Sequence, residues 1–307
     1  MGWGIAGSAA GYLGLFLFGL HFMSRQLSGA AGPTLQKLLA RVAGKPSSAF
    51  LSGCLVTGIL QSSSLTSVMV VGLVHARVMG LTQGIAVIIG ANVGTTVTAQ
   101  LLSFNLHRLA LPVIGVSVLL YLLPLPRVRP VFAALIGFGL VMLGLEGMAQ
   151  SLAPLQDSPL VSRMLAAAAE TPWKGLGGGI FTSIALQSSS AVMGLVLSLA
   201  LEEMVTLPAA VAVLIGADLG TCATALVASL GMGYAARTAA WSHFLFNLIS
   251  LLLALIFFPQ LLWLASVTAT ALPRQLANFH TLYNLLGAVV LLPLTPFWAR
   301  ILQRKLL

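Results

Sequence analysis

Charged side chains are scarce in this chain. Only 7% of its 307 residues are Asp, Glu, Lys or Arg, and only six residues are acidic. A soluble globular domain carries about 25% charged residues, so the composition excludes that class. Hydrophobic residues make up 58% of the chain, and the mean hydropathy is +1.02. We therefore expect a polytopic protein that lies in a lipid bilayer.

Cysteine is equally scarce. Cys54 and Cys222 lie far apart in apolar or small-residue runs, so they are expected to pack rather than to form a disulfide or bind a transition metal. The formal net charge is +9, but the basic residues lack the clustered, aromatic-rich pattern of a nucleic-acid surface. No nucleic-acid partner is expected. No basic segment precedes the first apolar stretch, so a cleaved signal peptide is not expected either.

Two polar clusters interrupt the apolar sequence with the same four letters. Gln-Ser-Ser-Ser occurs at residues 61–64 and again, 126 residues later, at 187–190. A second pair of polar segments has the same spacing: Gly-Ala-Asn-Val-Gly-Thr starts at Gly90, and Gly-Ala-Asp-Leu-Gly-Thr starts at Gly216. Two features repeated in one order and at one spacing indicate a tandem duplication. Consecutive hydrogen-bonding side chains at membrane depth need a cavity or a ligand, because hydrocarbon offers no partner.

The duplication predicts the domain organisation. Residues 1–128 are expected to form the first repeat, 129–258 the second, and 259–307 a C-terminal transmembrane helix with a short cytoplasmic tail. Residues 24–47 are expected as an interfacial helix or loop, and residues 151–174 as a polar linker. Each half of a Gln-Ser-Ser-Ser segment spans about a dozen apolar residues, too few to cross a bilayer but enough for a half-helix. The predicted fold is therefore an all-α polytopic membrane protein of two inverted repeats, each with a re-entrant helical hairpin and a broken helix, plus an extra C-terminal helix.

The loop charges favour hairpins over straight crossings. With hairpins, one side of the membrane holds eleven basic residues and no acidic one: Arg25, Lys37, Arg41, Lys45, Arg77, Arg127, Arg129, Arg237, Arg300, Arg304 and Lys305. The other side holds four of each sign: Arg108, Arg163, Lys174 and Arg274 with Asp157, Glu170, Glu202 and Glu203. Straight crossings would blur this separation. Because cytoplasmic loops are enriched in Lys and Arg, we expect the C-terminus inside and the N-terminus outside the plasma membrane.

The serine clusters have the chemistry of an anion site. Serine is a favoured N-cap, so half-helices that begin near Leu65 and Ala191 would present hydroxyls and free backbone N–H groups. Two such helix N-termini that face one point can bind an anion without arginine or lysine. Amide oxygens, Thr hydroxyls, helix-end carbonyls and the Asp218 carboxylate are hard oxygen ligands that suit a hard cation. An anion site beside cation sites in an inverted repeat is typical of a secondary symporter.

These residues also resemble a known family. The paired Gln-Ser-Ser-Ser clusters, the paired Gly-Ala-Asn/Asp-x-Gly-Thr segments and the closing Asn-Phe-His-Thr-Leu-Tyr-Asn at 278–284 are similar to the type II sodium-dependent phosphate cotransporters, in a short bacterial form without a soluble C-terminal domain. The resemblance covers nearly the whole chain. It implies phosphate-binding residues Gln61, Ser62, Ser63, Ser64, Gln187, Ser188, Ser189, Ser190, Thr95 and Thr221. It implies sodium-binding residues Gln61, Ser64, Asn92, Thr95, Gln187, Ser190, Asp218 and Thr221. Cys222 departs from the pattern, because the first repeat has a hydroxyl there, in Thr96.

The expected function is sodium-coupled symport of inorganic phosphate across the plasma membrane by alternating access, without a cofactor and without enzymatic activity. Proton coupling, efflux of phosphate and transport of a related oxyanion remain open within transport. From other classes, an intramembrane serine hydrolase needs a base beside its serine, and a passive anion channel would lack coupling. Assembly into a homo-oligomer is also left open.

Each polar motif also has a purely structural interpretation. Ser and Thr can back-bond to helix carbonyls, and glycines can simply bring helices close together. Asp218 is favoured as a cation ligand, because a lone carboxylate inside a membrane must be paired, protonated or cation-bound. His243 with Asn247, and His280 with Asn284, share a helix face at a spacing of four residues. These pairs are expected to hold helices together, with a proton relay as the less favoured alternative.

Overall fold

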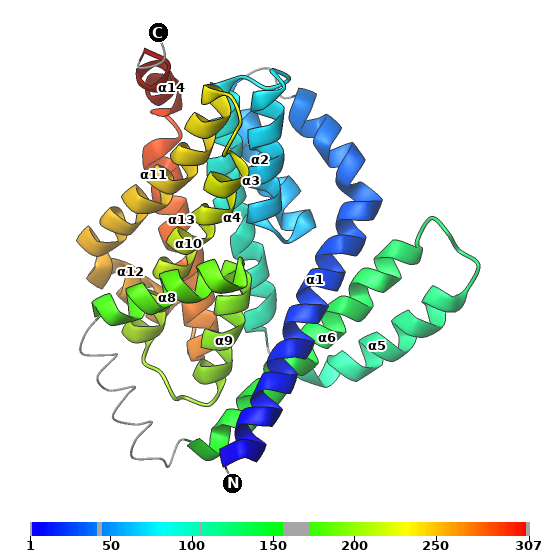
Figure 1. The fold of residues 1–307 in the computed structure, drawn as a ribbon. Coiled ribbons are helices and arrows are strands. Elements are labelled where there is room, and N and C mark those ends of the chain that lie inside the picture. Colours follow the sequence, from blue (N-terminus) through cyan, green and yellow to red (C-terminus); the bar gives the residue numbers. More distant parts are fainter. Residues whose placement is uncertain (1, 42–44, 105, 156–171, 305–307) are drawn as a thin grey trace.

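The computed structural model describes residues 2–41, 45–104, 106–155 and 172–304 (Figure 1). Within these ranges the chain is helical and contains no strand. Its elements are α1 (Gly2–Arg41), α2 (Pro46–Leu60), α3 (Ser63–His75), α4 (Leu81–Ser103), α5 (His107–Leu122), α6 (Arg129–Leu152), η1 (Ala153–Leu155), α8 (Pro172–Leu186), α9 (Ser189–Leu201), α10 (Leu207–Ala228), α11 (Tyr234–Ile256), α12 (Phe258–Val267), α13 (Leu272–Leu291) and α14 (Thr295–Arg304). The expected all-α fold is confirmed. Helices satisfy their backbone groups internally, which an apolar chain in lipid requires.

Five described helices are long and apolar enough to cross a bilayer: α1, α4, α6, α10 and α11. A sixth crossing results if α13 and α14, which meet at a bend of 65°, are counted together. The protein is therefore a multi-pass membrane protein.

The two serine clusters fall at breaks between short helices. α2 and α8 have 15 residues each, and α3 and α9 have 13. At 1.5 Å per residue each is roughly 20 Å long, less than the roughly 30 Å of a hydrocarbon core. A helix–break–helix arrangement at both clusters is thus confirmed. Entry and exit of each hairpin on one side of a membrane stays a prediction.

The broken helix predicted for each repeat does not lie in its second polar segment. α4 runs without interruption through Gly90–Ala99, and α10 runs through Gly216–Ala225. The physical reason is that the polar side chains bond back to their own helix instead of opening it. Thr95 Oγ1 donates to the Ala91 carbonyl at 3.0 Å, and Thr221 Oγ1 donates to the Ala217 carbonyl at 3.1 Å.

Two other boundaries differ from expectation. Residues 24–41 are not a separate interfacial segment, because α1 continues through them to Arg41 with Pro33 inside the helix. The C-terminal part contains three helices rather than one, since α12, α13 and α14 follow α11. Most of the predicted 151–174 linker lies outside the described residues, as do Asp157, Arg163 and Glu170.

The first helices of the two halves, α1 and α6, run in opposite directions. A Cβ added to Gly19 of α1 would lie 2.8 Å from the Gly137 carbonyl oxygen of α6, and one added to Gly144 would lie 2.6 Å from the Phe16 nitrogen. Residue numbers therefore rise along α1 as they fall along α6, as Figure 1 shows. The sequence aligns Phe18–Leu20 with Leu143–Leu145. The antiparallel arrangement of these helices is what an inverted repeat requires.

The loops gather at two opposite ends of the molecule. At one end, the Gly233 nitrogen donates to His75 Nδ1 at 3.1 Å, which joins the end of α3 to the start of α11. At the other end, Arg274 Nη1 donates to Ser103 Oγ at 2.9 Å, which joins the start of α13 to the end of α4. Figure 1 shows the N-terminus at the lower end and the C-terminus at the upper end.

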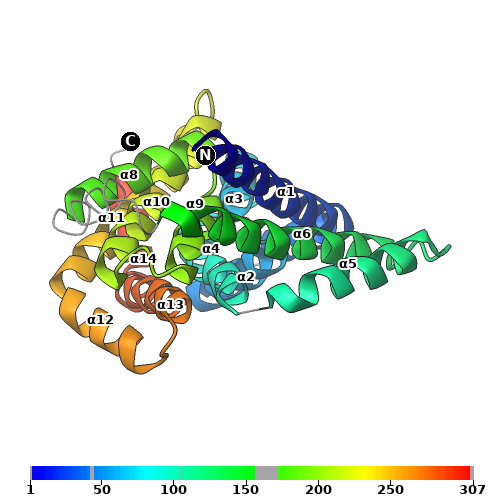
Figure 2. The ribbon, with the colours of Figure 1, turned by 90° about the horizontal axis from the view of Figure 1, so that it is seen from below.

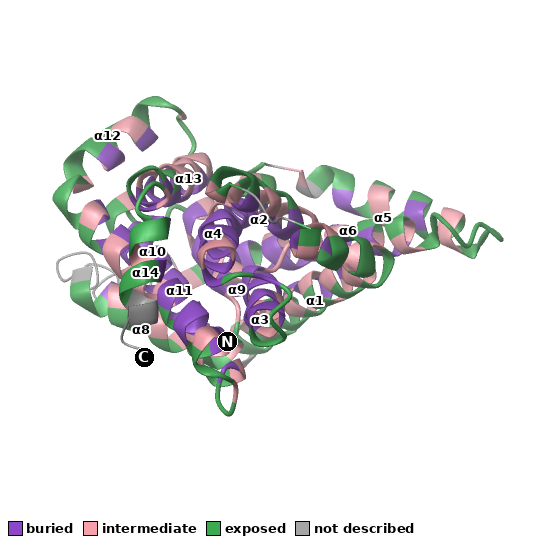
Figure 3. Ribbon diagram, turned by 90° about the horizontal axis from the view of Figure 1, so that it is seen from above, coloured by how far each residue is buried: buried purple, intermediate pink, exposed green. Residues whose placement is uncertain are grey.

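Burial is concentrated in the centre of the bundle. α4 and α9 are surrounded by other helices, whereas α5 packs mainly on α6 and projects to one side with it and with α1 (Figures 2 and 3). On α5, Leu111, Leu119 and Leu122 are about two-thirds exposed, at 67%, 69% and 71%. In a membrane these side chains contact lipid.

Candidate functional site

The two breaks have the same local geometry. Gln61 and Gln187 both adopt the left-handed conformation, with φ of 55° and 52°. The next residue then caps the following helix: Ser62 Oγ accepts from the Leu65 nitrogen, and Ser188 Oγ accepts from the Ala191 nitrogen, each at 3.2 Å. The serine therefore starts each second half-helix as a serine N-cap should. The backbone N–H groups of the first turn have no acceptor within the helix.

Three carbonyls at the helix end before the first break already have hydrogen-bond donors. The Thr57 carbonyl accepts from the Gln61 nitrogen, and the Gly58 carbonyl accepts from the Gln61 side-chain amide. The Leu60 carbonyl accepts from Ser24 Oγ of α1 at 2.9 Å. These three carbonyls thus accept hydrogen bonds from the protein itself, whereas helix-end carbonyls were expected to bind a cation.

The glycines of the polar segments bring helices into backbone contact. A Cβ added to Gly90 of α4 would lie 2.0 Å from the Phe50 carbonyl oxygen of α2. One added to Gly216 of α10 would lie 2.1 Å from the Leu176 carbonyl oxygen of α8. The packing interpretation of these glycines is confirmed. It fixes each polar segment against the first helix of its own hairpin.

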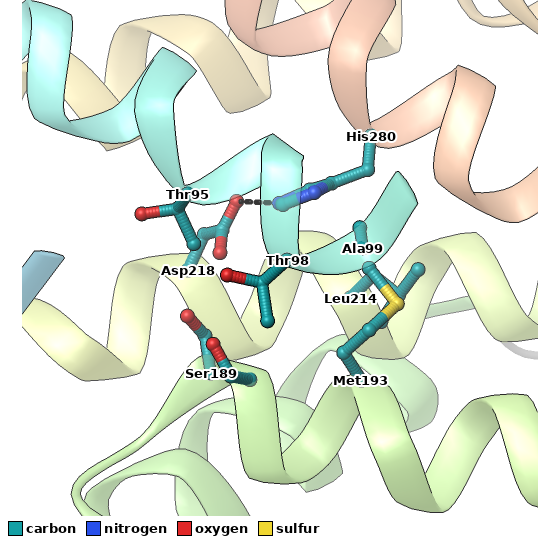
Figure 4. A pocket seen from close by; sticks show the side chains of 9 residues that line it. Thr95, Thr98, Ala99, Ser189, Met193, Leu214, Asp218 and His280 are labelled. Atoms are coloured by element: carbon teal, nitrogen blue, oxygen red, sulfur yellow. Dashed lines mark hydrogen bonds and ion pairs between the residues drawn. The ribbon is translucent and has the colours of Figure 1, made fainter. Parts of the chain in front are cut away.

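The second helix of each hairpin packs on both halves. α9 contacts α10 of its own half and α4 of the other, and α3 contacts α4 of its own half and α10 of the other. A small cavity lies where α4, α9, α10 and α13 meet (Figure 4). It is lined by Thr95, Thr98, Ala99, Ser189, Ser190, Met193, Leu214, Asp218 and His280. Hydroxyls from both halves and one carboxylate thus face a common space.

Asp218 is the only described carboxylate that lines this cavity, and it is 5% exposed. Three groups on α13 bond to the same carboxylate oxygen, Oδ2: His280 Nε2 at 2.9 Å, Tyr283 Oη at 2.5 Å and Asn284 Nδ2 at 3.4 Å. In Figure 4 the other oxygen points into the cavity, toward Thr98. A buried carboxylate oriented in this way offers its second oxygen to a ligand.

A weaker version of this arrangement exists at the equivalent position of the first repeat. Asn92, 126 residues before Asp218, has its Oδ1 3.4 Å from His243 Nε2 of α11. Asn247, one turn further along α11, donates to Cys222 Sγ at 3.0 Å. The expectation that His243 and His280 hold helices together is confirmed, because each bonds to a residue of another helix.

The predicted site residues do not all gather at the cavity. Thr95, Ser189, Ser190 and Asp218 line it. The other predicted residues do not line the cavity and lie around the two breaks or on α4 and α10: Gln61, Ser62, Ser63, Ser64, Asn92, Gln187, Ser188 and Thr221. Gln187 is exposed, whereas Ser63, Asn92 and Thr221 are buried.

Two polar cavity residues were not among the predicted ligands. Thr98 is 3% exposed, and its hydroxyl has no hydrogen-bond partner among the described residues. It belongs to the same polar segment as Thr95 and lies one helical turn further on, so helical periodicity alone places it on the same face. His280 was expected only to hold helices together. Its position beside Asp218 depends on tertiary packing.

Comparison with known proteins identifies the family. The chain matches the Na+/Pi-cotransporter family over residues 15–150 and 152–289. The family model thus matches twice in succession, and each match covers most of one half of the chain. The chain belongs to the Na+/Pi-cotransporter family. No solved structure matches it.

Its relatives in the Na+/Pi-cotransporter family differ in length. A Bacillus subtilis protein, "Uncharacterized protein YqeW", is 28% identical over 288 residues, which cover 94% of each chain. Proteins named "Putative inorganic phosphate export protein YjbB" are 29% identical in Salmonella typhimurium, over 94% of this chain, and in Escherichia coli K12, over 93%. The chain spans only about half of those two relatives, 54% and 53%.

Proposed function

We propose that this protein is a secondary transporter that moves inorganic phosphate together with sodium by alternating access. The observation that carries the proposal is the cavity in which the N-terminus of α9 meets Asp218 and the α4 hydroxyls. A helix N-terminus with serine hydroxyls suits an oxyanion, and a carboxylate among hydroxyls suits a hard cation. Membership of the Na+/Pi-cotransporter family supports both ligands.

The anion is proposed to bind at the start of α9. Ser189 and Ser190 line the cavity there, and Ser188 already caps the helix by accepting from the Ala191 nitrogen. The backbone N–H groups of Ser189 and Ser190 are therefore left for a ligand. Phosphate would accept from these groups and from the two hydroxyls, without any basic side chain.

The cation is proposed to bind at Asp218. Sodium at this carboxylate would place a positive charge beside the phosphate, and the two ligands would stabilise each other. Thr95 and Ser190 supply further oxygens on the cavity wall. The phosphate and sodium sites are proposed to be completed when the halves rearrange during the transport cycle. The residues that would then join them are Gln61, Ser62, Ser63 and Ser64 of the first hairpin, with Asn92 and Thr221.

The distribution of charge supports the proposed membrane orientation. The end of the molecule that contains the loops after α3, α5 and α10 carries Arg77, Arg127, Arg129 and Arg237. The opposite end carries Arg108 and Arg274 together with Glu202 and Glu203. The positive-inside rule supports a cytoplasmic location for the first end, with the N-terminus outside and the C-terminus inside a bacterial inner membrane.

A second candidate is proton-coupled or outward movement of phosphate. The names of the YjbB relatives favour export, and the His280 imidazole lies beside the Asp218 carboxylate, an arrangement that a proton-coupled transporter can use. A serine hydrolase is less well supported. His280 and Ser189 line one cavity, but His280 Nε2 bonds to Asp218 and its Nδ1 has no partner among the described residues. A catalytic serine would need to bond to that second nitrogen.

Phosphate uptake into proteoliposomes tests the proposal. Radiolabelled phosphate should accumulate above its external concentration when an inward sodium gradient is present. It should only equilibrate when potassium replaces sodium. Accumulation driven by an imposed pH gradient without sodium would favour proton coupling instead. Equilibration under every gradient would identify a passive channel and contradict the proposal.

A further inference from the structure

The α13 contacts to Asp218 all converge on one atom. His280, Tyr283 and Asn284 bond to Oδ2 and leave Oδ1 without a hydrogen-bond donor from the described residues. All three side chains are buried: His280 is 4% exposed, Tyr283 1% and Asn284 0%. A carboxylate bound through one oxygen by three donors has little freedom to rotate, so its second oxygen keeps a fixed direction.

A second helix of the chain has nearly the same sequence motif. α11 carries His243-Phe-Leu-Phe-Asn247-Leu, and α13 carries His280-Thr-Leu-Tyr-Asn284-Leu. His243 approaches Asn92, and His280 approaches Asp218, which occupies the position of Asn92 in the second repeat. The motifs therefore serve equivalent positions in the two halves.

The two motifs differ at the residue just before the asparagine, which in α13 adds a hydrogen-bond donor to Asp218. Tyr283 supplies a hydroxyl to Asp218, whereas Phe246 occupies the same place in the α11 motif, where the neighbour is the neutral Asn92. The extra hydroxyl thus occurs where the chain buries a carboxylate. A buried charge needs more hydrogen-bond donors than a buried amide does, because its desolvation costs more.

We propose that Tyr283 is a positioning residue that orients the Asp218 carboxylate through Oδ2, so that Oδ1 faces the cavity and sets the affinity for sodium. This inference rests on the proposed function, in which Asp218 binds the coupled cation. Tyr283 does not line the cavity. It therefore acts through Asp218 and not by contact with sodium or phosphate. His280 and Asn284 hold the same oxygen from either side of Tyr283 along α13.

The test measures sodium binding without transport. Sodium that binds the folded protein raises its melting temperature in a concentration-dependent way. In the detergent-purified protein, Tyr283→Phe should raise the sodium concentration for half of this effect on the order of tenfold, because it removes one hydrogen bond to a charged group. Tyr121→Phe is the matched control, since the Tyr121 ring stacks on Arg129 away from the cavity. N-methylglucamine chloride replaces sodium chloride to keep ionic strength constant.

The double variant separates positioning from a general loss of stability. Asp218→Asn should weaken the sodium effect by itself, and Tyr283→Phe should change it no further in that background. A melting temperature that falls in Tyr283→Phe with an unchanged sodium dependence would overturn the inference. So would the absence of any sodium effect in the unmodified protein. Sodium protection that depends on Tyr283, combined with no phosphate accumulation in proteoliposomes, would uphold the inference and overturn phosphate transport alone.

Discussion

Gly53 and Gly179, which are 126 residues apart, each lie against the carbonyl oxygen of a valine in the neighbouring helix, and the two valines occupy equivalent positions in the two halves. A Cβ added to Gly53 would lie 2.1 Å from the carbonyl oxygen of Val87, and one added to Gly179 would lie 2.0 Å from that of Val213. Val87 and Val213 are themselves 126 residues apart. The two halves therefore repeat not only a sequence pattern but the same backbone contact.

This contact predicts that Gly179→Ala separates α8 from α10 and destabilises the protein. Overpacking of a close contact costs about 1–3 kcal/mol, and here the obstacle is backbone that cannot rotate away. Gly178→Ala is the control, because a Cβ there would meet nothing within 4 Å. Thermal unfolding of the purified variants measures the difference. Similar melting temperatures for the two variants would contradict the packing.

The N-cap at the second break predicts an effect of Ser188→Ala. Loss of the hydroxyl that accepts from the Ala191 nitrogen should cost about 1 kcal/mol. It should also raise the KM for phosphate, because α9 would begin less regularly beside the cavity. Ser188→Thr keeps an oxygen in the same place and should restore most of both properties. If Ser188→Thr lowered stability and raised the KM for phosphate as much as Ser188→Ala does, the capping role of Ser188 would be contradicted.

The cavity predicts unequal roles for the two central serines. Ser189 lines it and Ser63 does not, although both are buried. Ser189→Ala should raise the KM for phosphate about tenfold, the usual cost of one hydrogen bond to a charged group. Ser63→Ala should have a smaller effect. Equal increases in KM, measured in proteoliposomes, would show that the two clusters contribute alike.

Asp218→Asn should weaken the dependence of phosphate transport on sodium. The amide removes the negative charge but preserves the shape of the side chain, so the fold should persist. The sodium concentration for half-maximal uptake should rise, or the charge moved in each cycle should change. Glu203→Gln is the matched control, since Glu203 is exposed and lies in the loop after α9. Unchanged sodium activation and current in Asp218→Asn would remove this residue from the cation site.

Arg274 is expected to stabilise the contact between α4 and α13. Its guanidinium donates to the Gln100 carbonyl at 3.3 Å and to Ser103 Oγ at 2.9 Å, and it lies 4.1 Å from the centre of the Phe104 ring. Lysine keeps the charge but cannot make all three contacts at once. Arg274→Lys should therefore lower the melting temperature. The same change at Arg300, whose Nε donates to the Pro296 carbonyl of its own helix, should have little effect.

The sequence predicted the breaks and the packing motifs well, because local chemistry determines them. Ser62 and Ser188 can cap a helix wherever it begins, and the 126-residue repeat located both caps without a structure. The continuity of α4 was harder to predict. Glycine and threonine weaken an isolated helix, but Gly90 packs on α2 and Thr95 bonds back to Ala91. Tertiary contacts thus override the local preference.

The site was only partly predictable for a similar reason. Within the repeated polar segments Asp218 is the one charged residue, and its counterpart Asn92 is neutral, which predicted a special role for Asp218. Its three partners lie on α13, which is more than 60 residues away in sequence. Spacing within α13 places His280 and Asn284 on one face, but it cannot indicate which helix that face meets. The unequal placement of Ser63 and Ser189 likewise follows from packing between the halves.

The crosswise packing of α3 on α10 and of α9 on α4 makes each half incomplete by itself. If the chain were cut between α5 and α6, each fragment would keep its hairpin but would lose one of the helices on which the second helix of that hairpin packs. The two fragments would have to be produced together to rebuild the cavity. The duplication thus created a molecule whose halves are mutual scaffolds, and a gene for only one half would need a second copy of its product to function.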